Sequence, residues 1–245
     1  CIPDLDHQRG HVRKWMKPTR PSRALDRLGL TQQIRHDPKG VVGIIGPWNF
    51  PLYLTIVPAG SALAAGNRVM IRPSSVTAHT TEVLCSRAPE YFAVDELAFA
   101  GPEHGRGADF SRLPYDHLFF TGSPGVGKSI ARDAAENLTP VTLELGGKNP
   151  VIVDTSADIE RTARNLASSR LVNGGQVCMC PDYVWVPQQD MDRFCDIVLD
   201  QWRSTLPAIA GNPEYTAVVN DSNYERIVGL IDDAVAKGAT KQEAA

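Results

Sequence analysis

The chain has 245 residues, of which 42% are hydrophobic and 22% are charged, and its net charge is −3. This length allows one large domain or two small ones, and the composition is that of an ordinary soluble globular protein. The weak negative charge gives no reason to expect nucleic acid as a partner. Five cysteines without disulfide-rich spacing favour a reduced, cytoplasmic compartment.

The first 40 residues hold nine Lys or Arg residues against four Asp or Glu residues. We interpret this excess as a solvated, partly helical surface, with an anion-binding patch as the less favoured alternative. His7 and His11 have the spacing of metal ligands, but no third ligand is near in sequence, so we expect no metal. No signal peptide is visible, and the first residue is Cys1 rather than Met, so we expect a longer product.

Residues 41–66 carry no formal charge and are long enough to span a bilayer, which takes ~20 residues. Pro47, Pro51 and Pro58 interrupt this stretch, and an amide at Asn49 does not suit a lipid-facing helix. We therefore expect no membrane span. A buried parallel strand at 40–45 followed by a buried helix at 53–65 fits the pattern better.

Strand-like and helix-like segments alternate along the rest of the chain. This order predicts an α/β fold with a mostly parallel, Rossmann-like sheet. We expect further strands at 68–72, 116–120, 141–145, 151–153 and 183–186, and further helices at 77–89, 128–137, 157–171, 190–203 and 223–237. Asn149-Pro150 has the character of a hinge, which divides the chain into a dinucleotide-binding domain at 1–148 and an incomplete catalytic domain at 149–245.

The loop after the strand at 116–120 matches a phosphate-binding pattern. Gly122-Ser-Pro-Gly-Val-Gly-Lys128-Ser129 fits G-x-x-x-x-G-K-[ST], and Val151-Ile-Val-Asp154 has the form of a strand that ends on a magnesium-binding Asp. A Gly-rich loop that opens a helix presents backbone N–H groups to phosphate, whichever nucleotide carries it. The loop alone thus leaves a P-loop NTPase and a dinucleotide-binding protein open.

Two motifs in the second half carry chemistry. Val141-Thr-Leu-Glu-Leu-Gly-Gly-Lys148 holds the carboxylate of Glu144, and Asn173-Gly-Gly-Gln-Val-Cys178 ends on a cysteine after a Gly-rich turn. Cysteine catalysis needs an accessible thiolate in a polarised setting and a group that activates the next nucleophile. Together with Gly46-Pro-Trp-Asn-Phe-Pro51, these motifs resemble the aldehyde dehydrogenase superfamily.

The resemblance implies NAD(P)-dependent oxidation of an aldehyde to the carboxylic acid. Cys178 would attack the carbonyl carbon, hydride loss would leave a thioester, and Glu144 would act as the base for its hydrolysis. Asn49 and the backbone N–H of Cys178 would stabilise the oxyanion, and removal of one such donor typically costs ~10²–10³ in rate. A buried structural thiol is the alternative for Cys178, and we interpret Cys180 as a packing residue.

The resemblance also favours a dinucleotide over a nucleoside triphosphate, because Phe120-Thr-Gly-Ser-Pro-Gly-Val-Gly127 looks like the family's turn beside the cofactor pyrophosphate. It implies a set of cofactor-binding residues: Ile45, Pro47, Trp48, Arg72, Ser74, Ser75, Gly122, Ser123, Val126, Gly127, Leu145 and Gly146. The family usually has Lys-Pro-Ser-Glu where this chain has Arg72-Pro-Ser-Ser75. Loss of the carboxylate removes a group that repels a 2′-phosphate, and Arg72 adds a phosphate-binding fork, so we expect NADP⁺ as well as NAD⁺ to bind.

The resemblance covers about residues 35–240 and is strongest to coniferyl-aldehyde-type dehydrogenases, which implies a small-molecule aldehyde as the substrate. Members of the family are much longer and form homo-oligomers through a strand that this chain lacks. Two hypotheses of different class follow: part of an active NAD(P)-dependent aldehyde dehydrogenase, or a truncated dinucleotide-binding module without turnover. A P-loop NTPase is a distant third.

Overall fold

The computed structural model describes residues 1–21 and 28–244. The chain forms two compact units, Cys1–Leu145 and Gly146–Ala245. The sequence predicts a domain boundary after Lys148. Asn149 and Pro150, the predicted hinge, begin a strand whose backbone pairs with a neighbouring strand.

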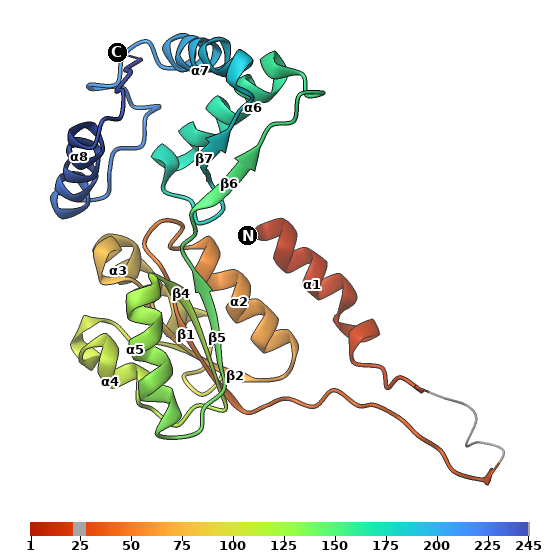
Figure 1. Ribbon diagram of the computed structural model, residues 1–245. Helices are drawn as coiled ribbons and strands as arrows, with labels where there is room; N and C mark the ends of the chain where they lie inside the picture. Colours follow the sequence, from red (N-terminus) through yellow and green to blue (C-terminus); the bar gives the residue numbers. More distant parts are fainter. Residues whose placement is uncertain (22–27, 245) are drawn as a thin grey trace. The chain divides into compact units, whose positions relative to one another are not determined.

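The first unit is built on a five-stranded sheet in the order β3-β2-β1-β4-β5, in which every pair is parallel (Figure 1). The strands are β1 (Val41–Ile45), β2 (Arg68–Arg72), β3 (Leu97–Phe99), β4 (His117–Gly122) and β5 (Val141–Leu145). The helices are α1 (Ile2–Trp15), α2 (Tyr53–Ala64), α3 (Ala78–Arg87), α4 (Gly107–Ser111) and α5 (Pro124–Ala135). The predicted α/β class with a mostly parallel sheet is confirmed.

Helices cover both faces of this sheet, and a hydrophobic cluster lies under each (Figure 1). Successive strand residues point to opposite faces, so Leu118 and Phe120 pack toward α4 and α5 while Phe119 packs toward α2. Ile44, Ile71 and Leu118 are fully buried. Strands buried on both faces need continuous apolar runs, which is why Val41–Ile45 is hydrophobic throughout.

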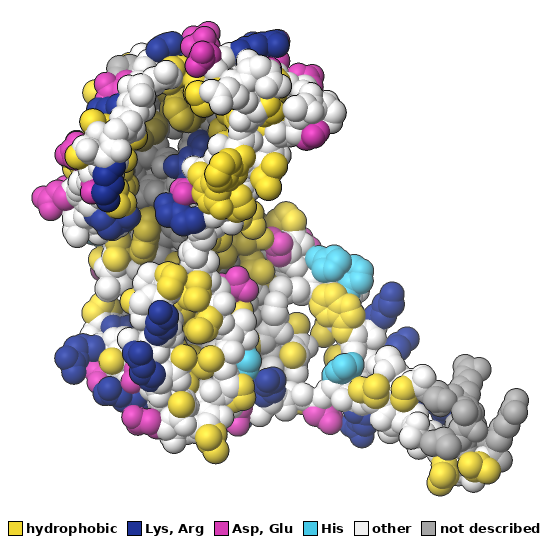
Figure 2. Space-filling model, in the orientation of Figure 1, with side chains coloured by type: hydrophobic (Ala, Val, Ile, Leu, Met, Phe, Trp, Pro, Cys, Tyr) yellow, Lys and Arg dark blue, Asp and Glu magenta, His cyan; other side chains and the backbone are white. Residues whose placement is uncertain are grey.

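Helix α1 packs on α2 through polar contacts. Gln8 donates from Nε2 to Ser61 Oγ at 2.8 Å, and the Tyr53 hydroxyl donates to Asp4 Oδ1 at 3.1 Å. The imidazole rings of His7 and His11 are stacked with centroids 4.1 Å apart, and histidine side chains mark α1 in Figure 2. Part of the basic surface predicted for the first 40 residues, at 22–27, lies outside the described residues.

The second unit contains a two-stranded parallel sheet and three helices. These are β6 (Asn149–Ile152), β7 (Pro181–Trp185), α6 (Ile159–Leu171), α7 (Met191–Thr205) and α8 (Asp221–Ala236). Its core joins both sheet and helices through six buried side chains: Val153, Ile159, Ala163, Ala167, Phe194 and Val198.

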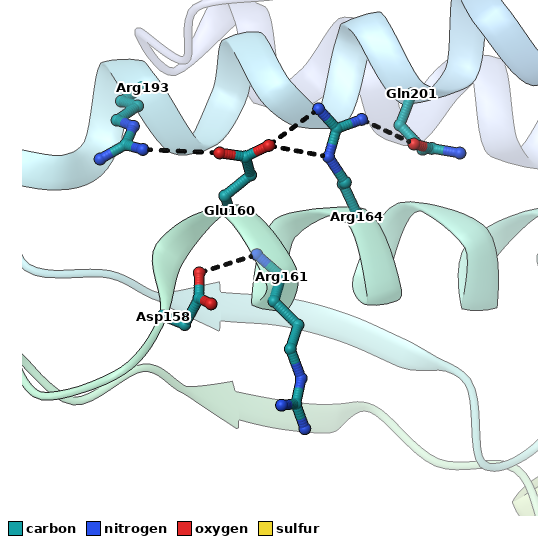
Figure 3. A network of polar contacts seen from close by, with 6 residues as sticks. All are labelled: Asp158, Glu160, Arg161, Arg164, Arg193 and Gln201. Carbon is teal, nitrogen blue, oxygen red and sulfur yellow. Dashed lines mark hydrogen bonds and ion pairs between the residues drawn. The ribbon is translucent and has the colours of Figure 1, made fainter.

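A polar network on the surface also links α6 to α7 (Figure 3). The Glu160 carboxylate accepts from Arg164 at 3.1 Å and faces Arg193 at 3.8 Å, while Arg164 donates to Gln201 at 3.2 Å. Asp158 begins α6 by accepting the backbone N–H of Arg161 at 3.1 Å. Because these side chains are exposed, the network adds little to stability.

Two short elements were missed from the sequence, and one helix was predicted too late. Strand β3 has three residues and helix α4 has five, too few to show a period. Helix α5 begins at Pro124 rather than at Lys128, because Ser123 caps it and proline suits the first helical position.

Among residues 1–21 and 28–244, no helix is long and apolar enough to cross a membrane. Helix α2, which lies in the uncharged stretch, has 12 residues and buries Thr55 and Ala59 inside the first unit. The predicted helix is confirmed, although most of its residues are half-buried rather than buried.

Thr55 offers a test of polar burial. Its side chain is 0% exposed, and its Oγ1 makes no hydrogen bond to any residue that the structure describes. Because a buried hydroxyl without a partner costs free energy, we expect Thr55→Val to raise the free energy of unfolding by about 1 kcal/mol. Urea unfolding measures the change. Thr139→Val is the matched control, since Thr139 Oγ1 donates to Tyr115 O at 2.8 Å; this variant should lose stability, and equal effects would contradict the prediction.

His117 should make the stability of the first unit depend on pH. Burial, followed by the charge of Lys39, lowers the pKa of this histidine. The unfolded chain therefore takes up the proton more readily, so stability is full above the unfolded pKa of about 6.5 and falls as the pH drops through the lower, folded pKa. Urea midpoints between pH 8 and pH 5 should show a shallower decline for His117→Gln. His79→Gln, which alters an exposed histidine of α3, should leave the decline as in the parent; identical slopes in all three proteins would contradict the assignment.

Candidate functional site

The strand order of the first unit creates a switch point between β1 and β4. From β1 the chain proceeds through β2 and β3 toward one edge of the sheet, and β4 and β5 extend toward the other. In open parallel sheets, ligands bind outside the carboxyl ends of the strands at such a point. Here Ile45, the last residue of β1, is paired with Phe120 of β4, so the loops that follow the two strands lie side by side.

The residues predicted to bind the cofactor gather on this edge of the sheet. Those in the first unit lie at or just after the carboxyl ends of four neighbouring strands: Ile45, Pro47 and Trp48 at β1, Arg72, Ser74 and Ser75 at β2, Gly122, Ser123, Val126 and Gly127 at β4, and Leu145 at β5. Gly146 begins the second unit. The arrangement fits a dinucleotide, whose two halves need adjacent loops at one sheet edge.

The phosphate-loop pattern takes a different form from the one predicted. The predicted loop extended to Gly127, but Pro124–Gly127 form the first turn of α5. The Gly127 N–H donates to Ser123 O at 2.9 Å and the Val126 N–H to Ser123 Oγ at 3.4 Å, so both amides are used inside the helix. In a P-loop these residues would form a loop around the phosphates, whereas here they are helical, so the pattern does not have the P-loop conformation.

Gly127 lets α5 approach the sheet closely. A Cβ atom at this position would lie 2.8 Å from Cδ2 of Leu145, so any other residue would require the Leu145 side chain to move. The lack of a side chain therefore brings the start of the helix against the end of β5.

Arg72 holds the loop that follows β3. Its Nη1 donates to Ala100 O at 3.1 Å and also to Gly101 O, and its Nη2 donates to Gly105 O at 2.8 Å. Three of the five N–H donors of the guanidinium are thereby engaged. The fork that we predicted for a phosphate thus binds main-chain carbonyl groups of the loop after β3.

The loop held by Arg72 carries a carboxylate that sequence reasoning missed. The Glu103 side chain contacts His104 Nδ1 at 2.8 Å. Its own backbone N–H, the charge of His104 and the backbone of Gly101 lower the pKa of the Glu103 carboxyl. No sequence signal revealed this loop, because the strand before it, β3, has only three residues and shows no hydrophobic period.

Asn49 and Glu144 lie on the same edge of the first unit. Asn49 is half-buried in the connection from β1 to α2, and Gly46 in that connection donates its N–H to Arg72 O at 2.9 Å. Glu144 is exposed near the carboxyl end of β5, opposite Thr121 of β4. The topology thus places both predicted catalytic residues of this unit beside the predicted cofactor residues.

Cys178 belongs to the second unit and follows a turn with unusual backbone geometry. After α6 ends at Leu171, Asn173 and Gly174 adopt φ values of 52° and 60°. Such left-handed conformations favour Gly and, less strongly, Asn. A Cβ at Gly174 would lie 2.4 Å from the carbonyl oxygen of Thr216, so only glycine fits there.

Gln176 binds this turn to a distant part of the same unit. Its Nε2 donates to Asn173 O at 3.0 Å and to Ala217 O at 3.1 Å, while its Oε1 accepts the Val219 N–H at 3.0 Å. A side-chain amide that satisfies three backbone groups fixes the chain just before Cys178. Gln176 of the Asn173–Cys178 motif therefore has a structural role.

The two neighbouring cysteines differ in exposure. Cys178 is exposed, whereas Cys180 is 6% exposed and lies with its Sγ 3.7 Å from Ser169 O. Cys180 thus packs in the interior, as we expected, and the thiol of Cys178 is accessible to reagents. Arg170 supports the segment beyond the turn by donating to Pro181 O at 2.9 Å.

A family model described as the aldehyde dehydrogenase family matches residues 6–242. The chain belongs to the aldehyde dehydrogenase family. A probable coniferyl aldehyde dehydrogenase of Caulobacter vibrioides is 46% identical over 244 residues, which is 97% of this chain and 50% of that protein.

Solved structures of the family agree with the fold. Staphylococcus aureus AldH in a substrate-bound state has a TM-score of 0.88 at 32% identity, over 96% of this chain and 52% of its own. A 3,6-anhydro-L-galactose dehydrogenase in complex with NAP has a TM-score of 0.81 at 31% identity, over 97% of this chain and 50% of its own. The chain therefore spans about half the length of the relatives it matches.

Proposed function

We propose that the protein to which this chain belongs oxidises an aldehyde to the carboxylic acid with NAD⁺ or NADP⁺. The observation that carries this proposal is the exposed Cys178 at the end of a left-handed Gly-rich turn, in a chain of the aldehyde dehydrogenase family. Reactive cysteines are accessible to solvent, whereas structural ones are buried. The names of the relatives point to an aromatic aldehyde such as coniferyl aldehyde as the substrate.

Each predicted catalytic residue has one role in this proposal. The Cys178 thiolate attacks the carbonyl carbon and forms a thiohemiacetal, while the Asn49 amide and the Cys178 N–H donate to the oxygen that becomes negative. Glu144 accepts a proton from the water that hydrolyses the later thioester, which releases the acid and restores the thiol. When bound, the nicotinamide cofactor supplies the hydride acceptor of the oxidation step.

The alternative is a dinucleotide-binding module without turnover. Such a module would bind the dinucleotide at the carboxyl edge of the first sheet and would form no product. Homo-oligomer formation and a cytoplasmic location remain predictions. The five cysteines are free thiols, as expected for proteins in a reducing compartment.

Turnover by the purified chain separates these two functions. We expect NADH or NADPH, followed by absorbance at about 340 nm, to form from an aromatic aldehyde, and Cys178→Ala to abolish it because the nucleophile is lost. Cys180→Ala is the matched control, since this buried thiol lies two residues away and should leave most of the activity. A folded chain that binds dinucleotide, measured by calorimetry, but forms no product would instead support the module without turnover.

Cofactor choice should depend on Ser75, which is exposed after β2. A carboxylate introduced there would repel a 2′-phosphate and would suit a free ribose hydroxyl. We expect Ser75→Glu to weaken NADP⁺ binding by about tenfold, as expected for one added like-charge contact, and to leave NAD⁺ binding nearly unchanged. Calorimetric Kd values for both cofactors measure this, with Val76→Glu as the control at the next exposed position. Equal effects on the two cofactors would contradict the role of Ser75.

A further inference from the structure

We propose that Asn149 is a positioning residue that holds the main chain of Cys178 in its reactive orientation. The inference rests on the proposed function, because it assumes that Cys178 is the nucleophile. It concerns a residue that the sequence marked only as part of a hinge, and the two hydrogen bonds that carry the inference lie within the second unit.

The backbone around Cys178 forms a closed turn. The Cys180 N–H donates to the carbonyl oxygen of Val177 at 3.1 Å. This bond fixes the peptide group between Val177 and Cys178, which is the group that carries the Cys178 N–H. The direction of the expected oxyanion donor is therefore set by the turn itself.

Asn149 holds the peptide groups on the other side of the nucleophile. Its Nδ2 donates to Cys178 O at 2.8 Å and to Cys180 O at 3.0 Å. An amide nitrogen has two N–H donors, and both are used here. Together with the bond that closes the turn, this fixes the peptide groups before and after Cys178, so neither φ nor ψ of the nucleophile can rotate freely.

The residues next to Asn149 contact the same segment. A Cβ at Gly147 would lie 3.2 Å from Cys178 O, so the absence of a side chain allows this close approach. Lys148 forms an ion pair with Asp182 at 3.0 Å. Lys148 and Asn149 thus bind the 178–182 segment at two successive positions, and Gly147 leaves room for it.

The position of Asn149 at the start of β6 shows why its side chain can reach the turn. Asn149 pairs with Pro181, but Pro150 pairs with Tyr183, so the register of the sheet shifts between Asn149 and Pro150. Regular pairing with β7 starts only after this irregularity and does not require the Asn149 amide. The side chain is therefore used on the turn rather than on the sheet.

Alkylation of Cys178 by iodoacetamide tests this role without requiring turnover. Asn149→Asp removes the two donors and directs a carboxylate at two carbonyl oxygens, and Asn149→Leu removes the donors without adding a charge. We expect both variants to alkylate Cys178 about tenfold more slowly at fixed pH, the factor corresponding to one or two lost hydrogen bonds, and to alter its pH profile between pH 6 and 9.5. Mass spectrometry of peptides assigns the rate to each cysteine.

Matched controls distinguish positioning from general loosening. Asn212→Asp removes an amide-to-carbonyl bond of 2.8 Å to Ala208 elsewhere in the same unit and should leave Cys178 alkylation as in the parent. Cys85 and Cys195 are internal references whose rates should not change in the Asn149 variants. An unchanged Cys178 rate and profile, or an equal change at all three cysteines, would overturn the proposal.

The proposed function is tested by a different measurement from the role of Asn149. Absence of aldehyde-dependent NAD(P)H formation by the parent chain would argue against turnover. The alkylation rates would still decide whether Asn149 orients the thiol.

Discussion

The parallel pairing of β1 with both β2 and β4 is the constraint on which the first unit depends. Because β1 is hydrogen-bonded on both sides, the loops after three strands end at one edge of the sheet. Most of the predicted cofactor-binding residues and Asn49 lie at this edge or in the segments that follow it. Their positions follow from backbone hydrogen bonds and two apolar faces, so the edge is set before any ligand is bound.

In the second unit, the corresponding constraint is the backbone of one turn. Left-handed conformations at Asn173 and Gly174 reverse the chain after α6, and Gln176 anchors it to the 217–219 segment. Asn149 then binds the carbonyl groups beyond the turn. Four polar or small residues thus restrict the backbone on both sides of a single cysteine.

Several polar side chains at the predicted cofactor edge form hydrogen bonds with backbone groups. Arg72 donates to three carbonyl groups of the loop after β3, and Ser123 uses its hydroxyl to cap α5. The Arg72 guanidinium and the Ser123 hydroxyl therefore have a structural role besides the predicted binding role. Loops and helix starts expose backbone groups that need hydrogen-bond partners. The same residue type can both shape a site and bind in it.

Local patterns were sufficient for much of the fold. Strands 68–72 and 141–145 were predicted with their observed bounds, because continuous apolar runs bounded by breakers identify buried strands. Strand β3 and helix α4 were missed since three and five residues cannot show a period. The start of α5 was misplaced because a Gly-rich segment was taken for a loop, whereas Ser123 and Pro124 start a helix.

The sequence by itself determined the family, the α/β class and the identity of the candidate nucleophile, since motifs such as Asn173-Gly-Gly-Gln-Val-Cys178 depend on residue types at fixed spacing. Only the tertiary structure decided which partners those residues have. Arg72 meets carbonyl groups about 30 residues away, and Asn149 meets Cys178 at a separation of 29. Contacts at such distances along the chain arise from the pairing of strands and the close approach of backbones, and neither composition nor spacing encodes them locally.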